Sequence, residues 1–243
     1  SYNAENYILD ALESVKNQTY KNIELIISDD ASSDRTVDII RNWLSENSDR
    51  FTKYKFIESP VNTGITSNLN RAVKAATGEY VKLLASDDLI FENAIEDLLH
   101  FCLENNLDYC FSNVLPFDDE NSKKVKKLVQ IDALNSRKFF NKDNRGQYRS
   151  LLRLTTPLTF ILGALYNINV IKELGYFDEK YPMQDDYSFA LRLAKRGKKF
   201  EKLDVYTHKY RVRTNLDENY KKSRRHIEGY RCMRQIREDF VLR

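Results

Sequence analysis

Residues 83–91 read "LLASDDLIF", an apolar run interrupted by the adjacent carboxylates of Asp87 and Asp88. An earlier stretch, "IELIISDD", has the same form and ends in Asp29 and Asp30. Both apolar runs read as short buried strands. An aspartate after a strand often only forms a turn, which is the simpler explanation for either pair alone. Two pairs in equivalent positions favour a site, because ligands of parallel α/β sheets bind beyond the carboxyl ends of the strands.

The first half of the chain alternates between helical and strand patterns. In chain order we expect a helix over 4–17, a strand over 23–28, a helix capped by Ser33 or Asp34, a strand over 54–59, a helix over 67–76, a strand over 79–85, a helix over 92–105 and a strand over 108–114. This βαβ order with short links indicates an α/β fold with a mostly parallel sheet covered by helices.

The second half begins with a break in this order. We expect a polar loop over 115–130, helices over 135–154, a mixed segment over 157–166, a helix over 168–174, a helix over 184–197, a strand over 199–212 and a basic helix over 217–240. Because no linker rich in Gly or Pro separates these segments, we expect one domain over 1–243. Within it, we expect 1–115 to bind the donor, 116–210 to form the acceptor side, and 211–243 to form a basic helical tail.

Composition excludes several classes of protein. The chain is 42% hydrophobic and 31% charged, as in soluble globular proteins, and no apolar run approaches the roughly 18 residues that span a bilayer. Three cysteines without CxxC spacing argue against a disulfide framework or a zinc site and predict a reducing, cytoplasmic location, with Cys102 and Cys110 as core residues. Glycine-rich phosphate loops and the GxSxG motif are absent from the sequence.

Charge is distributed unevenly along the chain. Residues 187–243 carry 17 Lys or Arg against 7 Asp or Glu, whereas the rest of the chain is acidic. A basic tail on an acidic body predicts an anionic partner, although a merely solvated basic helix has the same pattern. No RNA- or DNA-binding motif accompanies the tail, so we expect no nucleic acid. The inner face of a membrane is the preferred partner, since each basic residue there contributes about 1 kcal/mol.

Four carboxylates at one sheet edge would repel one another and require a counter-ion. Oxygen ligands without clustered Cys or His suit Mg²⁺ or Mn²⁺ rather than zinc, and these ions share their shell with water and substrate phosphates. A third pair, Asp185 and Asp186, lies at the start of the helix over 184–197. Capping of that helix explains one of these two aspartates. The other is a candidate general base, with an ordinary pKa of about 3.9 that keeps it ionised at neutral pH.

Three ordered blocks carry a family resemblance. They are the opening block "SYNAENYILDALESVKNQTYKNIELIISDDASSDRT", the block "NTGITSNLNRAVKAATGEYVKLLASDD" and the block "LGYFDEKYPMQDDYSFALRLAKRG". These blocks resemble the family 2 glycosyltransferases, inverting nucleotide-sugar enzymes of the GT-A fold, over roughly residues 1–115 and 155–200. The resemblance implies a Rossmann-like three-layer sandwich with a C-terminal helical extension. It also implies transfer of a hexose or N-acetylhexosamine.

The resemblance implies a role for individual positions. Tyr2 would stack on the nucleotide base and Asp30 would hydrogen-bond to it. Asp87 would face the ribose or the metal, and Asp88 would ligate the Mn²⁺ or Mg²⁺ ion that bridges the diphosphate. Asp186 would deprotonate the acceptor hydroxyl, which attacks the anomeric carbon in line and inverts it.

Two departures from the family pattern affect these expectations. The apolar strand that normally precedes "SYN" is absent from the sequence, which predicts a less stable sheet. In "HKYRVRTNLD", Arg213 stands where a histidine is common, and an arginine could contact a diphosphate but could not ligate a metal. Arg213 is equally well explained as a surface arginine. His208 is a weaker candidate ligand.

The expected partners follow from this reading. The donor is a nucleotide sugar, with UDP favoured and thymidine or guanosine diphosphate sugars left open. The acceptor is a saccharide, a glycopeptide or a lipid-linked saccharide in the assembly of bacterial surface polysaccharide or glycoconjugate. The protein would be cytoplasmic, with peripheral contact at the inner membrane face. A non-catalytic nucleotide-sugar or glycan-binding module on the same fold is the alternative.

Overall fold

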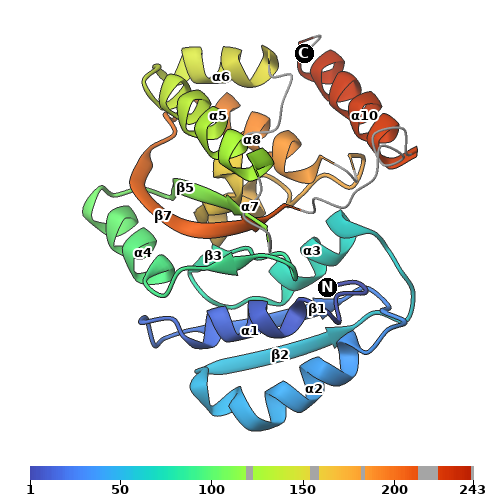
Figure 1. Cartoon of the computed structure of the whole chain (residues 1–243). Helices are drawn as coiled ribbons and strands as arrows, with labels where there is room; N and C mark the ends of the chain where they lie inside the picture. The colour runs from blue at the N-terminus through green and yellow to red at the C-terminus, as the bar shows by residue number, and fades with distance from the viewer. Residues whose placement is uncertain (119–122, 154–158, 182–183, 213–223, 242–243) are drawn as a thin grey trace.

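A computed structural model describes residues 1–118, 123–153, 159–181, 184–212 and 224–241 of the chain (Figure 1). Its elements, in chain order, are α1 (Ile8–Lys16), β1 (Glu24–Asp29), α2 (Thr36–Asn47), η1 (Ser48–Arg50), β2 (Lys53–Glu58), α3 (Ile65–Ala75), β3 (Tyr80–Lys82), β4 (Leu89–Ile90), α4 (Ala94–Glu104), β5 (Tyr109–Phe117), α5 (Lys123–Phe140), α6 (Asn144–Arg153), η2 (Thr159–Gly163), β6 (Leu165–Asn167), α7 (Ile168–Glu173), α8 (Asp185–Lys195), β7 (Lys202–Arg211) and α10 (Arg224–Val241).

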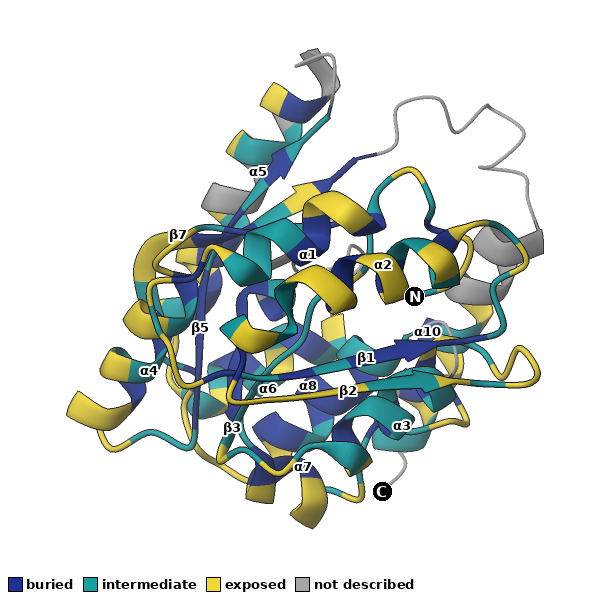
Figure 2. Ribbon diagram, turned by 90° about the horizontal axis from the view of Figure 1, so that it is seen from below, coloured by how far each residue is buried: buried dark blue, intermediate teal, exposed yellow. Residues whose placement is uncertain are grey.

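The N-terminal elements form a small parallel unit of their own. Strands β1 and β2 pair in parallel, from Glu24 beside Lys53 to Asp29 beside Glu58. Helices α1 and α2 lie on one side of this pair and α3 on the other (Figure 2). The apolar faces of α1 and α2 pack on the strands and bury a core that includes Ile8, Leu12, Leu25, Ile27, Ile40 and Trp43. The βαβ order predicted for this region is confirmed.

The larger sheet is mixed, so the prediction of a mostly parallel sheet is wrong. Its strand order is β3-β6-β5-β7-β4, and only β5 and β7 run parallel among its described pairs. The difference arises because β4, which was not predicted, and the short β6 both pair antiparallel with partners far away in the sequence. Strand β7 also curves along β5 (Figure 1), where the register shifts between Ser112 and Val114.

The predicted polar loop over 115–130 is also wrong. Strand β5 continues to Phe117, and α5 begins at Lys123. The apolar residues of the lysine-rich stretch recur at helical spacing, with Val125 buried and Val129 half-buried. A helix therefore forms there, because it buries this stripe and leaves charged residues such as Lys126 in water.

An aromatic core joins the second half of the chain. The ring of Phe111 on β5 stacks on Phe200 at 4.8 Å and is fully buried. Helix α10 packs into the same core through Met233 and Ile236, so the predicted C-terminal helix is held against the body. Cys102 and Cys110 are buried, as predicted. Among the described residues, no helix has the length and hydropathy needed to cross a membrane.

We expect Phe111→Ala to lower the free energy of unfolding by about 3–5 kcal/mol, because it removes a fully buried ring and leaves a cavity. Urea denaturation measures the change. The matched control is Leu103→Ala, since this leucine is 59% exposed and should change stability by less than about 0.5 kcal/mol. Equal effects of the two substitutions would contradict the assignment of the core.

Candidate active site

The aspartates at the end of β1, Asp29 in the strand and Asp30 after it, are both buried and both organise loops. Asp29 accepts hydrogen bonds from the backbone N–H and hydroxyl of Ser32 at 2.8 and 2.6 Å, and from the Ser1 hydroxyl at 2.9 Å. Asp30 accepts from the Thr63 N–H at 3.0 Å, the Thr63 hydroxyl at 2.7 Å and the Gly64 N–H at 2.7 Å. Asp30 thereby fixes the turn that leads into α3, where Gly64 has a φ of +88°.

The electrostatic setting of Asp30 keeps it ionised. Burial would raise the pKa of Asp30, but the hydrogen bonds from Thr63 and Gly64 outweigh that effect, and the Arg71 guanidinium adds to them at 3.5 Å. The pKa of Asp30 therefore lies below its usual range. The contact of Asp30 with a nucleotide base stays a prediction, and a base N–H would have to share oxygens that already serve these donors. Tyr2 beside this loop is 46% exposed, which leaves its ring accessible.

Asp88 is buried at the turn between β3 and β4, and the protein holds both of its carboxylate oxygens. The backbone N–H of Arg211 donates to Oδ1 at 2.9 Å, and His208 Nε2 lies 3.0 Å from Oδ2. This geometry arises because β4 pairs antiparallel with β7, which sets Ile90 opposite His208. Two donors from β7 therefore fix the orientation of the Asp88 carboxylate.

Behind His208 lies Lys82, the last residue of β3. Its Nζ donates to the carbonyls of Leu162 and Leu83 at 2.7 and 3.0 Å and lies 3.3 Å from His208 Nδ1. Burial lowers the pKa of Lys82 to about 7, with the charge of Asp88 acting in the opposite direction. Burial, followed by the charge of Lys82, lowers the pKa of His208 to about 4.

These contacts fix the protonation of the Lys82–His208–Asp88 chain. Because a carboxyl oxygen of Asp88 lies 3.0 Å from His208 Nε2 and accepts a hydrogen bond, His208 presents an N–H at Nε2. The proton shared by His208 and Lys82 resides on Lys82, whose pKa is the higher of the two. Between about pH 4 and pH 7, Lys82 is then an ammonium with three donors and three acceptors, and His208 is neutral with its proton on Nε2.

Arg211 connects this turn to the surrounding elements. Its Nε donates to the Asp87 carbonyl at 3.0 Å, and its Nη2 lies 3.4 Å from Asp10 on α1. Its guanidinium also packs on the rings of Phe117 and Tyr7, at 4.6 and 5.0 Å from their centroids. Arg211 is buried, so these partners offset the cost of removing its charge from water. The backbone of the Asp87–Asp88 turn is therefore held in place.

Asp87 is half-buried and Asp88 is buried, so the two carboxylates differ in access. Among the described residues, no group of three His, Cys, Asp or Glu side chains forms a ready metal cluster. Two carboxylates on a rigid turn nevertheless suit Mg²⁺ or Mn²⁺, because these ions keep several waters and share their shell with phosphates. Asp87 would provide the accessible ligand, and Asp88 retains lone pairs beyond those that serve Arg211 and His208.

Asp185 and Asp186 form the first turn of α8, as predicted. The Tyr187 N–H donates to Asp186 Oδ1 at 2.6 Å. Burial raises the pKa of Asp186, and burial together with the charge of Asp186 raises the pKa of Asp185 to about 7. The expectation of an ordinary pKa near 3.9 is therefore wrong, because the pair is desolvated and shares its negative charge.

The structure brings some of the predicted residues together. Asp29, Asp30 and Asp87 all act electrostatically on the amino group of Ser1, whose pKa burial lowers and these carboxylates raise. Asp29, Asp30 and Asp87 therefore lie around Ser1. No hydrogen bond joins Asp186 to either pair among the described residues. Arg213 lies outside the described residues.

Sequence reasoning missed two residues and undervalued a third. Lys82 and Arg211 were not predicted, and His208 was considered only as a metal ligand. The signal for Lys82 was available, because a lysine inside an otherwise apolar strand run needs a partner. Arg211 lies two positions before Arg213, and its role depends on the pairing of β4 with β7.

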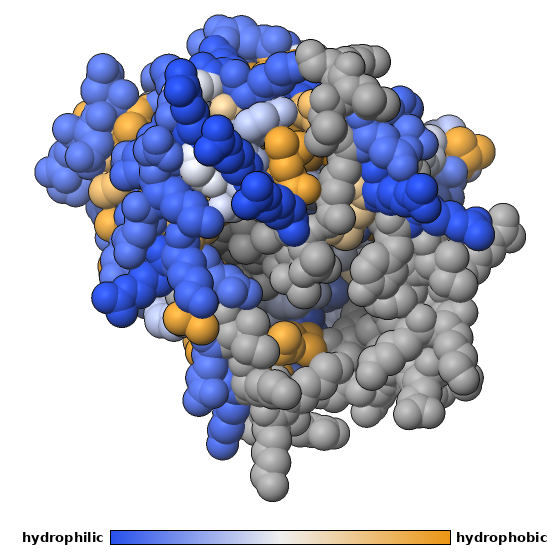
Figure 3. Space-filling model, turned by 90° about the horizontal axis from the view of Figure 1, so that it is seen from above, coloured by the Kyte–Doolittle hydropathy of each residue, from blue (hydrophilic) through white to orange (hydrophobic). Residues whose placement is uncertain are grey.

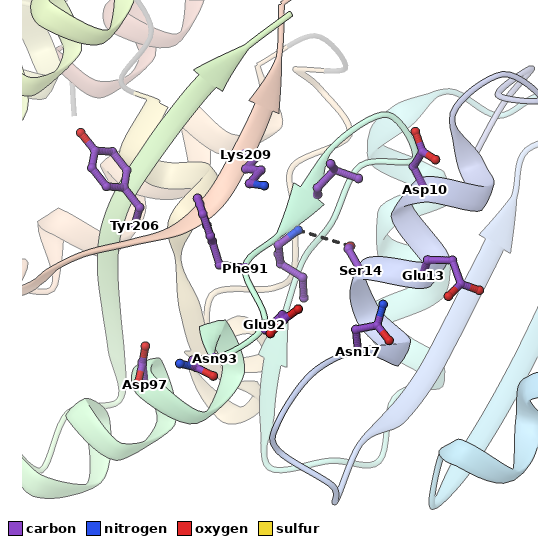
Figure 4. A pocket seen from close by; sticks show the side chains of 12 residues that line it. Asp10, Glu13, Ser14, Asn17, Phe91, Glu92, Asn93, Asp97, Tyr206 and Lys209 are labelled. Atoms are coloured by element: carbon purple, nitrogen blue, oxygen red, sulfur yellow. Dashed lines mark hydrogen bonds between the residues drawn. The ribbon is translucent and has the colours of Figure 1, made fainter. Parts of the chain in front are cut away.

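A separate pocket of about 640 Å³ lies between α1, β4 and the start of α4 (Figure 4). Its lining includes Asp10, Glu13, Glu92, Asp97 and the cation Lys209. It contains none of the predicted site residues. The candidate site is therefore the region around the two strand-end pairs, not this pocket.

Comparison with known proteins gives one family. The sequence profile described as "Glycosyl transferase family 2" matches residues 1–175. A relative from Escherichia coli, "UDP-Glc:alpha-D-GlcNAc-diphosphoundecaprenol beta-1,3-glucosyltransferase WfgD", is 36% identical over 113 residues, which is 46% of this chain and 42% of that protein. The chain spans about half the length of the curated relatives it matches.

Solved structures share the fold. The chain superposes on Staphylococcus aureus TarS 1–349 in complex with UDP-GlcNAc with a TM-score of 0.70 and 20% identity, over 97% of this chain and 63% of that one. It superposes on the mannosyltransferase PcManGT of Pyrobaculum calidifontis, in complex with GDP-Man and Mn²⁺, with a TM-score of 0.66 and 18% identity, over 96% and 60%. At this level of identity the likeness establishes the fold.

We expect His208→Leu to lower the free energy of unfolding by about 2–4 kcal/mol, because Lys82 and Asp88 each lose one of their buried hydrogen-bond partners. Urea denaturation measures the loss. The same substitution at His100, which is exposed and paired only with Glu104, should change stability by about 0.5 kcal/mol or less. A histidine side-chain ¹H–¹⁵N spectrum should show His208 neutral with its proton on Nε2. A doubly protonated ring at pH 7 would contradict the assignment.

Proposed function

The chain belongs to glycosyl transferase family 2 and has its GT-A fold, and from that premise we propose that it transfers a sugar from a nucleoside diphosphate sugar to an acceptor hydroxyl. The reaction is a single displacement that inverts the anomeric carbon. A UDP-sugar is the proposed donor, and the sugar is a hexose or N-acetylhexosamine. The observation that carries this proposal is the Asp87–Asp88 turn between β3 and β4, held by Arg211 and lying near the loop of Asp30.

At the donor side, the exposure of Tyr2 and the orientation of the Asp88 carboxylate support the proposed contacts. The exposed ring of Tyr2 would stack on the base, and Asp30 beside it would accept a base N–H. Asp87 and Asp88 would hold Mn²⁺ or Mg²⁺, with Asp88 oriented by His208 and Arg211. The bound ion would offset the negative charge of the diphosphate leaving group. Arg213 would contact the diphosphate.

At the acceptor side, Asp186 is the proposed general base. A base acts best when its pKa lies near the working pH, and burial moves the pKa of Asp186 in that direction. Asp185 keeps a second carboxyl beside it, so that the two groups titrate as an interacting pair. The ionised carboxylate of Asp186 would take the proton of the attacking hydroxyl.

The proposed acceptor is a saccharide, a glycopeptide or a lipid-linked saccharide in bacterial surface polysaccharide or glycoconjugate assembly. Support comes from the relative WfgD, whose name describes a lipid diphosphate acceptor. We place the chain in the cytoplasm as one domain over 1–243, with its basic tail over 211–243 in contact with the inner membrane face. A non-catalytic sugar-nucleotide or glycan-binding module is the second candidate, and turnover separates the two.

We expect UDP to bind in calorimetric titration with Mn²⁺ present, and EDTA to weaken the binding at least tenfold. Asp87→Asn should weaken binding in Mn²⁺ by about 10–100-fold, because it removes an ionised metal ligand. Asp97→Asn, an exposed carboxylate on α4, is the matched control and should bind like the wild type. Binding that is indifferent to EDTA would contradict the metal-dependent donor site. Binding of GDP but not of UDP would identify the donor as a guanosine diphosphate sugar.

We expect Asp186→Asn to lower the release of UDP from UDP-glucose or UDP-GlcNAc, with saccharide acceptors present, by about 10²–10⁴-fold while UDP affinity is retained. Because a base must be unprotonated and burial raises the pKa of Asp186, wild-type activity should fall as the pH is lowered, at a higher pH than an ordinary aspartate would give. Asp185→Asn removes a neighbouring negative charge and should move this fall to lower pH. Native turnover by Asp186→Asn would contradict the assignment of the base. Nucleotide binding without turnover by the wild type would favour the binding module.

A further inference from the structure

Helix α6 carries a row of three exposed arginines. Arg145, Arg149 and Arg153 are four residues apart, so they lie along one side of the helix over about 12 Å. In the described part of the chain none of the three forms an ion pair with an acidic side chain. The row is therefore an uncompensated line of positive charge.

The stability of α6 does not explain this row. Like charges at i,i+4 destabilise a helix, and a cation in the first turn, such as Arg145, opposes the helix dipole. The helix is held instead by its buried side, where Gln147 exchanges hydrogen bonds with the backbone of Phe200 and Leu151 is fully buried. The arginines therefore weaken α6, which indicates a use other than folding.

The surroundings of the row are also basic. A hollow of about 380 Å³ is lined by Lys142, Gly146, Arg149, Ser150 and Arg153. On neighbouring α5, Arg137 and Lys138 are exposed and, among the described residues, also lack an acidic partner. The exposed Leu134 is one turn earlier on the same helix. Figure 3 views the side on which α5, α6 and α10 lie in Figure 1, and the described residues there are mostly hydrophilic.

We propose that the exposed face of α5 and α6, centred on the row Arg145–Arg149–Arg153, docks on an anionic phospholipid membrane. A single phosphate spans too little of the 12 Å row to engage all three arginines, whereas a lipid surface presents many phosphates side by side. Leu134, 53% exposed on α5, offers an apolar side chain that an interfacial region could bury. This surface is distinct from the tail over 211–243.

The position of α6 gives this docking a direction. The hydroxyl of Tyr187 on α8 donates to the carbonyl of Leu151 on α6 at 2.8 Å, and the two helices pack together. Helix α8 begins with the carboxylates of Asp185 and Asp186. The membrane face is therefore one helix away from these carboxylates, where an acceptor attached to a membrane lipid could reach them. The docking itself does not depend on catalysis.

The test is co-sedimentation of the full chain with vesicles of phosphatidylcholine alone or mixed with phosphatidylglycerol. We expect binding only to the anionic vesicles, weakened by salt. The variant Arg145→Gln/Arg149→Gln/Arg153→Gln should lose about a hundredfold in affinity, since each basic residue near the surface contributes about fivefold. The control Lys21→Gln/Lys55→Gln/Lys172→Gln makes the same change in net charge at exposed lysines elsewhere and should bind like the wild type.

Further variants and competitors test the same proposal. Replacement of the three arginines by lysine should retain binding, and the glutamine variant should melt at an equal or higher temperature, because like-charge repulsion is removed. Equal losses in both glutamine variants would reduce the effect to net charge, and no loss in the α6 variant would place binding elsewhere. Either outcome overturns the proposal, as does wild-type indifference to anionic vesicles. Competition by inorganic phosphate beyond matched chloride, or tighter binding of polyuridylate RNA that requires the row, would assign another ligand.

Discussion

The buried guanidinium of Arg211 is the contact on which the candidate site depends. A buried cation must be paired, and Arg211 finds its partners in three separate parts of the chain: the Asp10 carboxylate on α1, the Asp87 carbonyl on the turn after β3, and the ring of Phe117 at the end of β5. Its backbone N–H adds a bond to Asp88. Displacing any of these segments would leave a charge or a hydrogen bond unsatisfied, so their relative positions are coupled. The rigidity proposed for the donor site is a consequence of this coupling.

The mixed sheet is what makes this arrangement possible. Strand β4 has only two residues, yet its antiparallel pairing with β7 places His208 beside Asp88 and brings Arg211 over the turn. In a wholly parallel sheet the chain would leave β3 for a helix, and the Asp87–Asp88 turn would remain an ordinary surface loop. Because the chain reverses direction between β3 and β4, the Asp87–Asp88 turn is held by β7 and its carboxylates are fixed in position. Lys82 completes the assembly from β3 itself, since its ammonium holds the far side of the His208 ring.

The sequence predicted the local elements better than their partners. Helices such as α3, α4 and α8 were found within a few residues because their apolar spacing is a local property, and the aspartates of Asp87–Asp88 were correctly placed after a strand. The strand pairing was not predictable in the same way, because β6 and β7 reach their partners across 55 to 120 residues. Helix α5 was predicted as a loop because its many lysines made the stretch look polar, although apolar residues such as Val125 recur at helical spacing. The contact of Arg211 with Asp88 spans 123 residues, and no local pattern specifies it.

The acidic residues at the two sides of the proposed site differ in electrostatics, and this difference matches their proposed roles. Asp30 is surrounded by backbone and hydroxyl donors and an arginine, which hold its pKa low and keep it a permanent acceptor. Asp185 and Asp186 share a desolvated helix start without a basic partner among the described residues, and their pKa values are raised. A group that accepts hydrogen bonds from a nucleotide must stay ionised, whereas a group that takes a proton from a hydroxyl gains from a pKa near neutrality. The fold therefore places aspartates in two different environments. The one around Asp30 stabilises the ionised carboxylate, and the one around Asp185 and Asp186 favours the protonated carboxyl.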